Sequence, residues 1–193
     1  MNMIKIALPA LLLFASSVQA VEYGTFQMNQ SALNFAYKQM GVPMQGKFKQ
    51  FSAQIAFDPA KPGNARAHID VNLASIDTGS TDANEEVAGK LWFDAKTYPL
   101  ASFVSSGVKA AGGNNYQVSG KLSIKGKTLD IVTPVTIKTD GKRAIIDGSF
   151  NIKRLAYGIG TGEWADLSTV ADDVQIVFHL IVFAAPVIPS STH

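Results

Sequence analysis

The sequence contains no cysteine, and this absence removes several kinds of chemistry at once. Thiol nucleophiles, iron–sulfur clusters, thiolate zinc sites and covalently attached haem all require cysteine. Histidine is almost as scarce, because His68, His179 and His193 are the three in 193 residues. A histidine-rich metal site is therefore not expected either, and we predict no bound metal.

An excess of charge of either sign is also missing, with 17 basic and 15 acidic residues. A nucleic-acid-binding protein would show a strong basic excess, so nucleic acid is not an expected partner. Lys121, Lys125 and Lys127 alternate along one predicted strand. They are interpreted as solvated surface in preference to a basic patch for a lipid phosphate or for transient contact with an anionic membrane surface, since the balanced charge gives little steering.

Long hydrophobic runs are confined to the first twenty residues. A single positive charge at Lys5 precedes the apolar run Ile6–Ala15, and Val18-Gln19-Ala20 supplies small residues at a cleavage site. This order is typical of a secretory signal peptide, so residues 1–20 are predicted to be removed after Ala20. Ten apolar residues are too few to span a bilayer.

The rest of the chain is predicted to be almost entirely strands. Polar and apolar residues alternate over 118–125, 146–153 and 69–73, as half-buried strands require. Glycine- and asparagine-rich turns at 61–64, 111–115 and 140–142 separate these runs. The pattern predicts an all-β antiparallel meander, which closes well into a barrel.

Three segments depart from this pattern. Asp82 and Glu85 have the spacing of a capping box, which predicts a short helix from about Ala83 to Lys90. The glycine-rich connection 155–171 is long enough to be functional. Residues 186–193 are predicted to form a disordered tail, which leaves one domain over 21–185.

Catalytic and nucleotide-binding motifs are weak or absent. Gly126-Lys127-Thr128 lacks the earlier glycine of a phosphate loop, and the glycines at 160 and 162 do not open a βαβ unit. There is no Gly-x-Ser-x-Gly elbow, and a lone His179 in an apolar strand is more often a satisfied residue than a catalytic base. We therefore predict that the protein is not an enzyme.

Six short motifs, in the same order, resemble those of the YceI-like family. Each is weak alone, but together they span some 150 residues. They are Ser31–Phe35 with Gly46-Lys47-Phe48, Ser75–Thr78, Leu91–Asp94 with Tyr98-Pro99, Val118–Gly126, Lys153-Arg154 with Tyr157–Gly160, and Asp172–Ile176.

The resemblance implies an extended, eight-stranded, lipocalin-like antiparallel β-barrel with a short helix. It also implies a periplasmic protein that holds a long polyisoprenoid, an isoprenoid quinone or a similar amphiphile inside the barrel, with no other cofactor. Three departures bear on the ligand headgroup. Gln30 and Gln39 stand where many members have histidine, and residues 82–86, Asp-Ala-Asn-Glu-Glu, replace an Arg-x-x-x-Leu segment of the family. A quinone, a prenyl phosphate and a fatty amide all remain open, and a two-fold homodimer is the default expectation.

Strand parity then predicts which side chains line the interior, although a slip of one residue would invert the set. Arg154 is predicted either to pair with a ligand oxygen or to form a salt bridge with a nearby aspartate. The predicted inner wall consists of Phe35, Tyr37, Phe48, Val71, Leu73, Phe103, Leu122, Ile124, Phe150, Ile152, Ile176 and Phe178, and the predicted mouth of Trp92, Arg154, Tyr157 and Trp164.

The main prediction is a carrier without catalysis. Two other hypotheses remain open: a partner protein of a membrane redox complex or a stress-response factor, with its barrel filled by side chains, and an enzyme, a hydrolase or isomerase, acting on hydrophobic substrates through residues such as His179 or Asp77.

Overall fold

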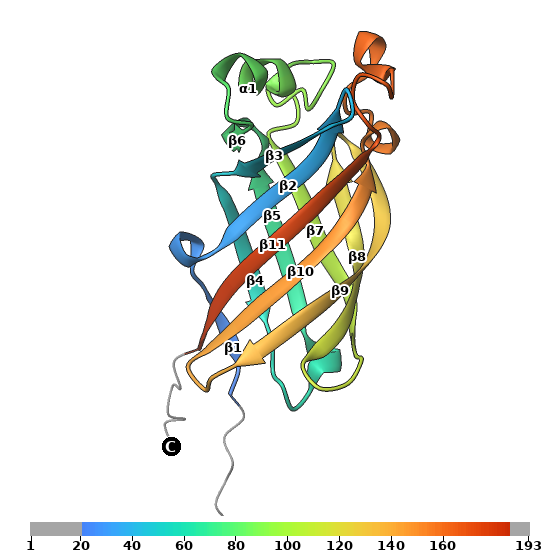
Figure 1. Ribbon diagram of the computed structural model, residues 1–193. Coiled ribbons are helices and arrows are strands. Elements are labelled where there is room, and N and C mark those ends of the chain that lie inside the picture. The colour runs from blue at the N-terminus through green and yellow to red at the C-terminus, as the bar shows by residue number, and fades with distance from the viewer. Residues whose placement is uncertain (1–20, 186–193) are drawn as a thin grey trace, which may run out of the picture.

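The computed structural model describes residues 21–185, so the predicted signal peptide and the predicted tail lie outside the described residues. This part of the chain is mainly antiparallel strand (Figure 1). The strands are β1 (Tyr23–Phe26), β2 (Ala32–Gln39), β3 (Val42–Phe48), β4 (Phe51–Ala56), β5 (Arg66–Asn72), β6 (Ile76–Asp77), β7 (Leu100–Ala110), β8 (Asn115–Ile124), β9 (Lys127–Thr139), β10 (Arg143–Lys153) and β11 (Asp173–Ala184). The helical elements are α1 (Thr81–Ala88) and the short 3₁₀ turns η1 (Met28–Gln30), η2 (Pro62–Asn64), η3 (Leu73–Ser75), η4 (Arg154–Tyr157) and η5 (Gly162–Ala165).

The strands form one curled antiparallel sheet in the order β4-β5-β7-β8-β9-β10-β11-β2-β3-β6, with β1 added on β11. The lipocalin-like, all-β architecture with a short helix is therefore confirmed. The strand count is eleven among the described residues rather than the predicted eight, and two of the additional strands are the four-residue β1 and the two-residue β6, which pair with longer strands.

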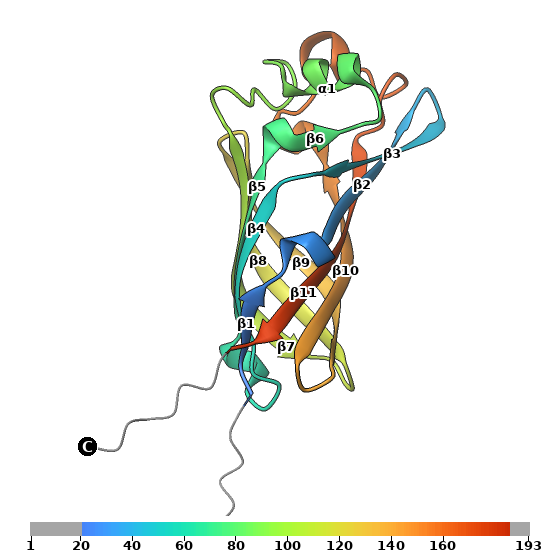
Figure 2. The same cartoon turned by 90° about the vertical axis from the view of Figure 1, so that its left-hand side faces the viewer.

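Strand β1 ties the curled sheet together at one end. Tyr23 pairs with Ala184 of β11 and also exchanges two backbone hydrogen bonds with Phe57, which directly follows β4. The first strand therefore joins the last strand to β4, at the end of the molecule opposite α1 (Figure 2).

Helix α1 begins and ends two residues earlier than predicted. Its N-cap is Ser80, whose hydroxyl accepts a hydrogen bond from the Ala83 amide, so the cap predicted at Asp82 is wrong. Ser80 is a good cap in its own right and has extended backbone, whereas Asp82 already lies in the first turn, where its charge favours the helix N-terminus. No helix within residues 21–185 is long and apolar enough to cross a bilayer.

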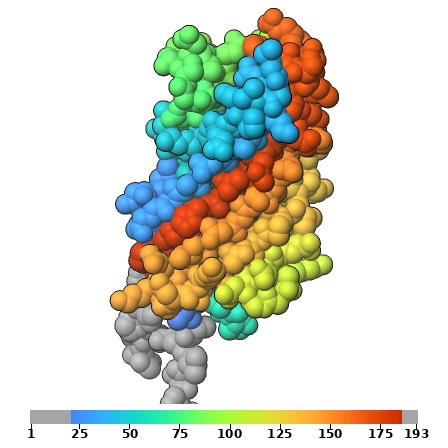
Figure 3. Space-filling view, viewed as in Figure 1, coloured from blue at the N-terminus to red at the C-terminus, as the bar shows by residue number. Residues whose placement is uncertain are grey.

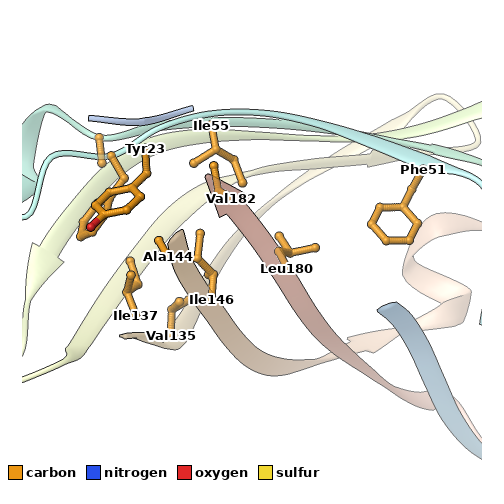
Figure 4. Close-up of a cluster of buried hydrophobic side chains, with 11 residues drawn as sticks. Tyr23, Phe51, Ile55, Val135, Ile137, Ala144, Ile146, Leu180 and Val182 are labelled. Carbon is orange, nitrogen blue, oxygen red and sulfur yellow. The ribbon is translucent and has the colours of Figure 1, made fainter. Parts of the chain in front are cut away.

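The buried side chains form two clusters, one towards each end of the sheet. The cluster near β1 joins Tyr23, Ile55, Ala144 and Val182, and Figure 4 shows side chains from facing walls pointing toward one another there. The second cluster lies near α1 and contains Leu73, Trp92 and Ile152 among others. The end near β1 is closed by packed side chains.

Candidate binding cavity

A cavity of about 590 Å³ runs inside the curled sheet, and almost all of its wall is apolar. The wall follows from strand parity, because alternate residues of each strand point to the same side. On β9, for example, Ile131, Thr133, Val135 and Ile137 line the cavity while Val132 is 56% exposed outside. The cavity is therefore formed by the same alternation that the sequence displays.

The structure places every predicted wall residue on the cavity lining, together with Trp92, Arg154 and Trp164. Tyr157 is the exception among the predicted mouth residues. It is 2% exposed and belongs to the cluster of buried side chains near α1, so its prediction as a mouth residue is wrong. Tyr157 belongs to the 3₁₀ turn η4, where its ring points into the core. The alternation of side chains along a strand does not predict the direction of a side chain in such a turn.

The prediction missed the part of the wall nearer β1. Phe51, Ile55, Val135, Ile146 and Leu180 also line the cavity. The last two could have been found, because Ile146 is four residues before Phe150 and Leu180 is four residues after Ile176 on the same strand faces. Extending the alternation along each strand would have given the full length of the cavity.

Three glycines leave room for three phenylalanine rings on this wall. Gly148 lies opposite Phe178 on the neighbouring strand, and Gly46 lies opposite Phe35. A Cβ on either glycine would overlap the ring, and a Cβ on Gly120 would overlap Phe103 in the same way. Each ring therefore occupies the space over a glycine instead of projecting farther into the cavity.

Arg154 holds the long connection 155–171 in place. Its side chain is 1% exposed, and its guanidinium donates to the backbone oxygens of Ala171, Ile159, Gly160, Trp164 and Val170, at 2.6–3.1 Å. An arginine has five N–H groups, so every donor is used. Neither alternative predicted for Arg154 is observed, since its partners are main-chain carbonyls rather than a ligand or an aspartate. Burial lowers the pKa of the guanidinium and Asp172 opposes this, but an arginine stays charged in a protein.

The connection 155–171 and α1 lie together at one end of the curled sheet (Figures 1 and 2). Residues of both segments line the cavity, and we call this end of it the mouth. The Trp164 indole donates to Glu86 of α1 at 2.9 Å. The Thr161 amide donates to the carbonyl of Leu91, in the loop that follows α1, also at 2.9 Å. Trp164 also packs on Trp92, with ring centroids 5.4 Å apart. Figure 3 shows that α1, the β2–β3 hairpin and this connection form one end of the surface.

The two glutamines that depart from the family pattern lie in different places. Gln39, near the end of β2, lines the cavity. Gln30 does not, because it belongs to the exposed turn η1 between β1 and β2. The prediction that both could face a headgroup is therefore wrong for Gln30.

Some charged groups on the outer surface have partners. The ammonium of Lys121 lies 2.9 Å from a carboxylate oxygen of Asp130. The ammonium of Lys125 donates to the carbonyls of Lys90 and Gly158. His179 has a partner that sequence reasoning missed, the Asp147 carboxylate at 2.6 Å on the adjacent strand. This exposed pair does not line the cavity, and no cluster within residues 21–185 has the ligands to hold a metal ion.

Comparisons with known proteins agree with this architecture. A crystal structure of Burkholderia cenocepacia BcnA is 51% identical, covers 81% of this chain and 98% of its own, and superposes with a TM-score of 0.79. A polyisoprenoid binding domain from Saccharophagus degradans is 20% identical, covers 86% of this chain and 100% of its own, and has a TM-score of 0.66, so it shows the fold.

Among sequence relatives, a UPF0312 protein of Pseudomonas syringae pv. tomato is 29% identical over 182 residues, covering 88% of this chain and 95% of the relative. The family model of the YceI-like domain matches residues 25–182. The chain therefore belongs to the YceI-like family.

Proposed function

We propose that this protein binds the apolar chain of a polyisoprenoid, an isoprenoid quinone or a similar amphiphile, without catalysing a reaction on it. The observation that carries the proposal is the cavity of about 590 Å³ with its nearly all-apolar wall. Burial of apolar surface contributes about 25 cal/mol per Å² removed from water. An elongated hydrocarbon chain suits a wall that offers few hydrogen-bonding partners along its length.

The polyisoprenoid binding domain that shares this fold supports the class of ligand. The predicted signal peptide supports a periplasmic location, where a water-insoluble molecule needs a protein to carry it. We therefore propose a periplasmic carrier. A homodimer stays a prediction.

Exposed apolar side chains beside the mouth would help a lipid to pass from a membrane into the cavity. Met40 and Val42, at the tip of the β2–β3 hairpin, are 77% and 57% exposed, and Leu167 in the connection is 53% exposed. The Met40 amide donates to Thr169, so the hairpin tip and the connection are neighbours. We propose that this rim makes transient contact with the bilayer surface.

The test is native mass spectrometry of the protein purified from its own compartment, followed by organic extraction and identification of bound molecules. We expect a stoichiometric lipid with a long prenyl or alkyl chain. A ligand-free mass that stays unchanged after incubation with long prenyl chains would contradict the proposal. It would favour the alternative hypothesis of an interaction partner without a lipid ligand.

A matched pair of variants tests whether the cavity is the binding site. Phe150 lies on the wall, with its ring centroid 6.4 Å from that of Phe178. Phe150→Trp enlarges this side chain, and we expect it to reduce lipid uptake severalfold. Val132→Trp adds more bulk still, but on the outside of β9, and should leave uptake unchanged. Equal uptake by both folded variants would place the lipid elsewhere.

A further inference from the structure

Two carboxylates lie at the mouth of the cavity. Asp82 and Glu86 are four residues apart on α1, so they share one face of the helix, and both line the cavity. Glu86 is held at this edge by the indole N–H of Trp164, at 2.9 Å. Within residues 21–185, neither carboxylate takes part in an ion pair.

Among the described residues that line the cavity, no cation at this end has a donor left to receive an anion. Arg154 lines the cavity, but backbone carbonyls take all five of its N–H groups. No lysine of the described chain lines the cavity. The other lining arginine, Arg66, begins β5 near the opposite end and donates to the carbonyls of Asn64 and Ala65.

The same end holds a buried donor without an acceptor. The indole N–H of Trp92 has no hydrogen-bond partner, although the residue lines the cavity and is 9% exposed. A carbonyl or hydroxyl oxygen satisfies such a donor and adds no charge beside the two carboxylates. A phosphate would bring negative charge to a place that already holds two negative groups, and like charges repel one another even at this solvent-exposed edge.

We propose that the mouth selects amphiphiles by the charge of the headgroup, with Asp82 and Glu86 as specificity-determining residues that disfavour anionic headgroups and leave uncharged ones unaffected. The proposal rests on the function proposed above, because it concerns the same cavity. It excludes the prenyl phosphates from the three headgroup classes that the sequence left open, and keeps quinones and fatty amides.

The experiment compares two probes with the same chain, geranylgeraniol and geranylgeranyl monophosphate, in equilibrium binding to the full mature protein. The double variant Asp82→Asn/Glu86→Gln removes both charges at the mouth and keeps an oxygen on residue 86 to accept from Trp164. The control Glu85→Gln/Glu163→Gln removes two charges from the same end. Both control residues are exposed and neither lines the cavity.

We expect the alcohol to bind more tightly than the monophosphate in the wild type. In the mouth variant this preference should shrink about fivefold to tenfold, through tighter binding of the monophosphate, while the control changes it less than twofold. An equal change in both variants would assign the effect to net charge and overturn the proposal. Tight binding of both probes with no preference would overturn it and leave the proposed function standing, whereas binding of neither probe would overturn both.

Discussion

The packing of Phe178 over Gly148 provides a direct test of how the cavity is kept open. These residues are cross-strand neighbours on β10 and β11, and a Cβ at residue 148 would overlap the ring. In Gly148→Ala the ring must turn farther into the cavity or the strands must move apart. Either change should alter both stability and the room left for a ligand.

The magnitude follows from two opposing effects. Overpacking a well-fitted site costs about 1–3 kcal/mol. Replacing glycine within a strand returns about 0.5–1 kcal/mol, because the unfolded chain loses freedom. The difference lies between about 0 and 2.5 kcal/mol, and we expect Gly148→Ala to lower the free energy of unfolding by about 1 kcal/mol, which for a domain of this size lowers Tm by about 2–4 °C.

Urea and thermal denaturation of ligand-free protein measure this loss, and lipid uptake measures the lost room. Gly107→Ala is the matched control on β7, since nothing lies within 4 Å of a Cβ there and its φ is not positive. The double variant Gly148→Ala/Phe178→Leu should recover part of the loss, as a positive coupling in a double-mutant cycle. If Gly148→Ala matches Gly107→Ala in both stability and uptake, the ring does not depend on the glycine and the reasoning fails.

Two further predictions concern the mouth. Arg154→Lys offers at most three donors to five backbone carbonyls, so at least two lose theirs, and the free energy of unfolding should fall by about 2–4 kcal/mol. Limited proteolysis should then cut within 155–171, and a loss below about 0.5 kcal/mol in urea denaturation would contradict this account. Met40→Asp/Leu167→Asp should slow lipid transfer from vesicles severalfold and leave equilibrium affinity for detergent-dispersed lipid unchanged, because both side chains are exposed outside the cavity. Unchanged transfer rates would argue against membrane contact through this rim.

Most of what could be predicted about the cavity wall came from the alternation of side chains between the two faces of each strand. Ile176 and Phe178 were assigned to the interior because they lie two residues apart and so share one strand face, and the structure places both on the cavity wall. Leu180 has the same parity and was missed only because the assignment stopped short of the strand end.

The mouth was less predictable for a physical reason. The partners of Arg154 are main-chain carbonyls, which every residue has, so no sequence pattern marks them. Likewise, Ser80 and Asp82 are both good capping residues, and in the structure Ser80 has the extended backbone of the N-cap while Asp82 lies in the first turn. Loop geometry of this kind depends on the whole fold rather than on local residue type.

The pairing of β1 with β11 has a consequence for how the protein folds. Tyr23 and Ala184 are neighbours, so this end of the sheet cannot be completed until nearly the whole chain is available. Contacts so distant in sequence form slowly, because the loop-closure entropy is lost before they add stability. Until then the chain exposes apolar strands and an incomplete interior, which makes chaperone protection valuable.

The two ends of the described chain lie close to each other and far from α1 (Figure 1). A circular permutant that joins these ends and is opened at a hairpin away from α1 should therefore fold with its mouth undisturbed.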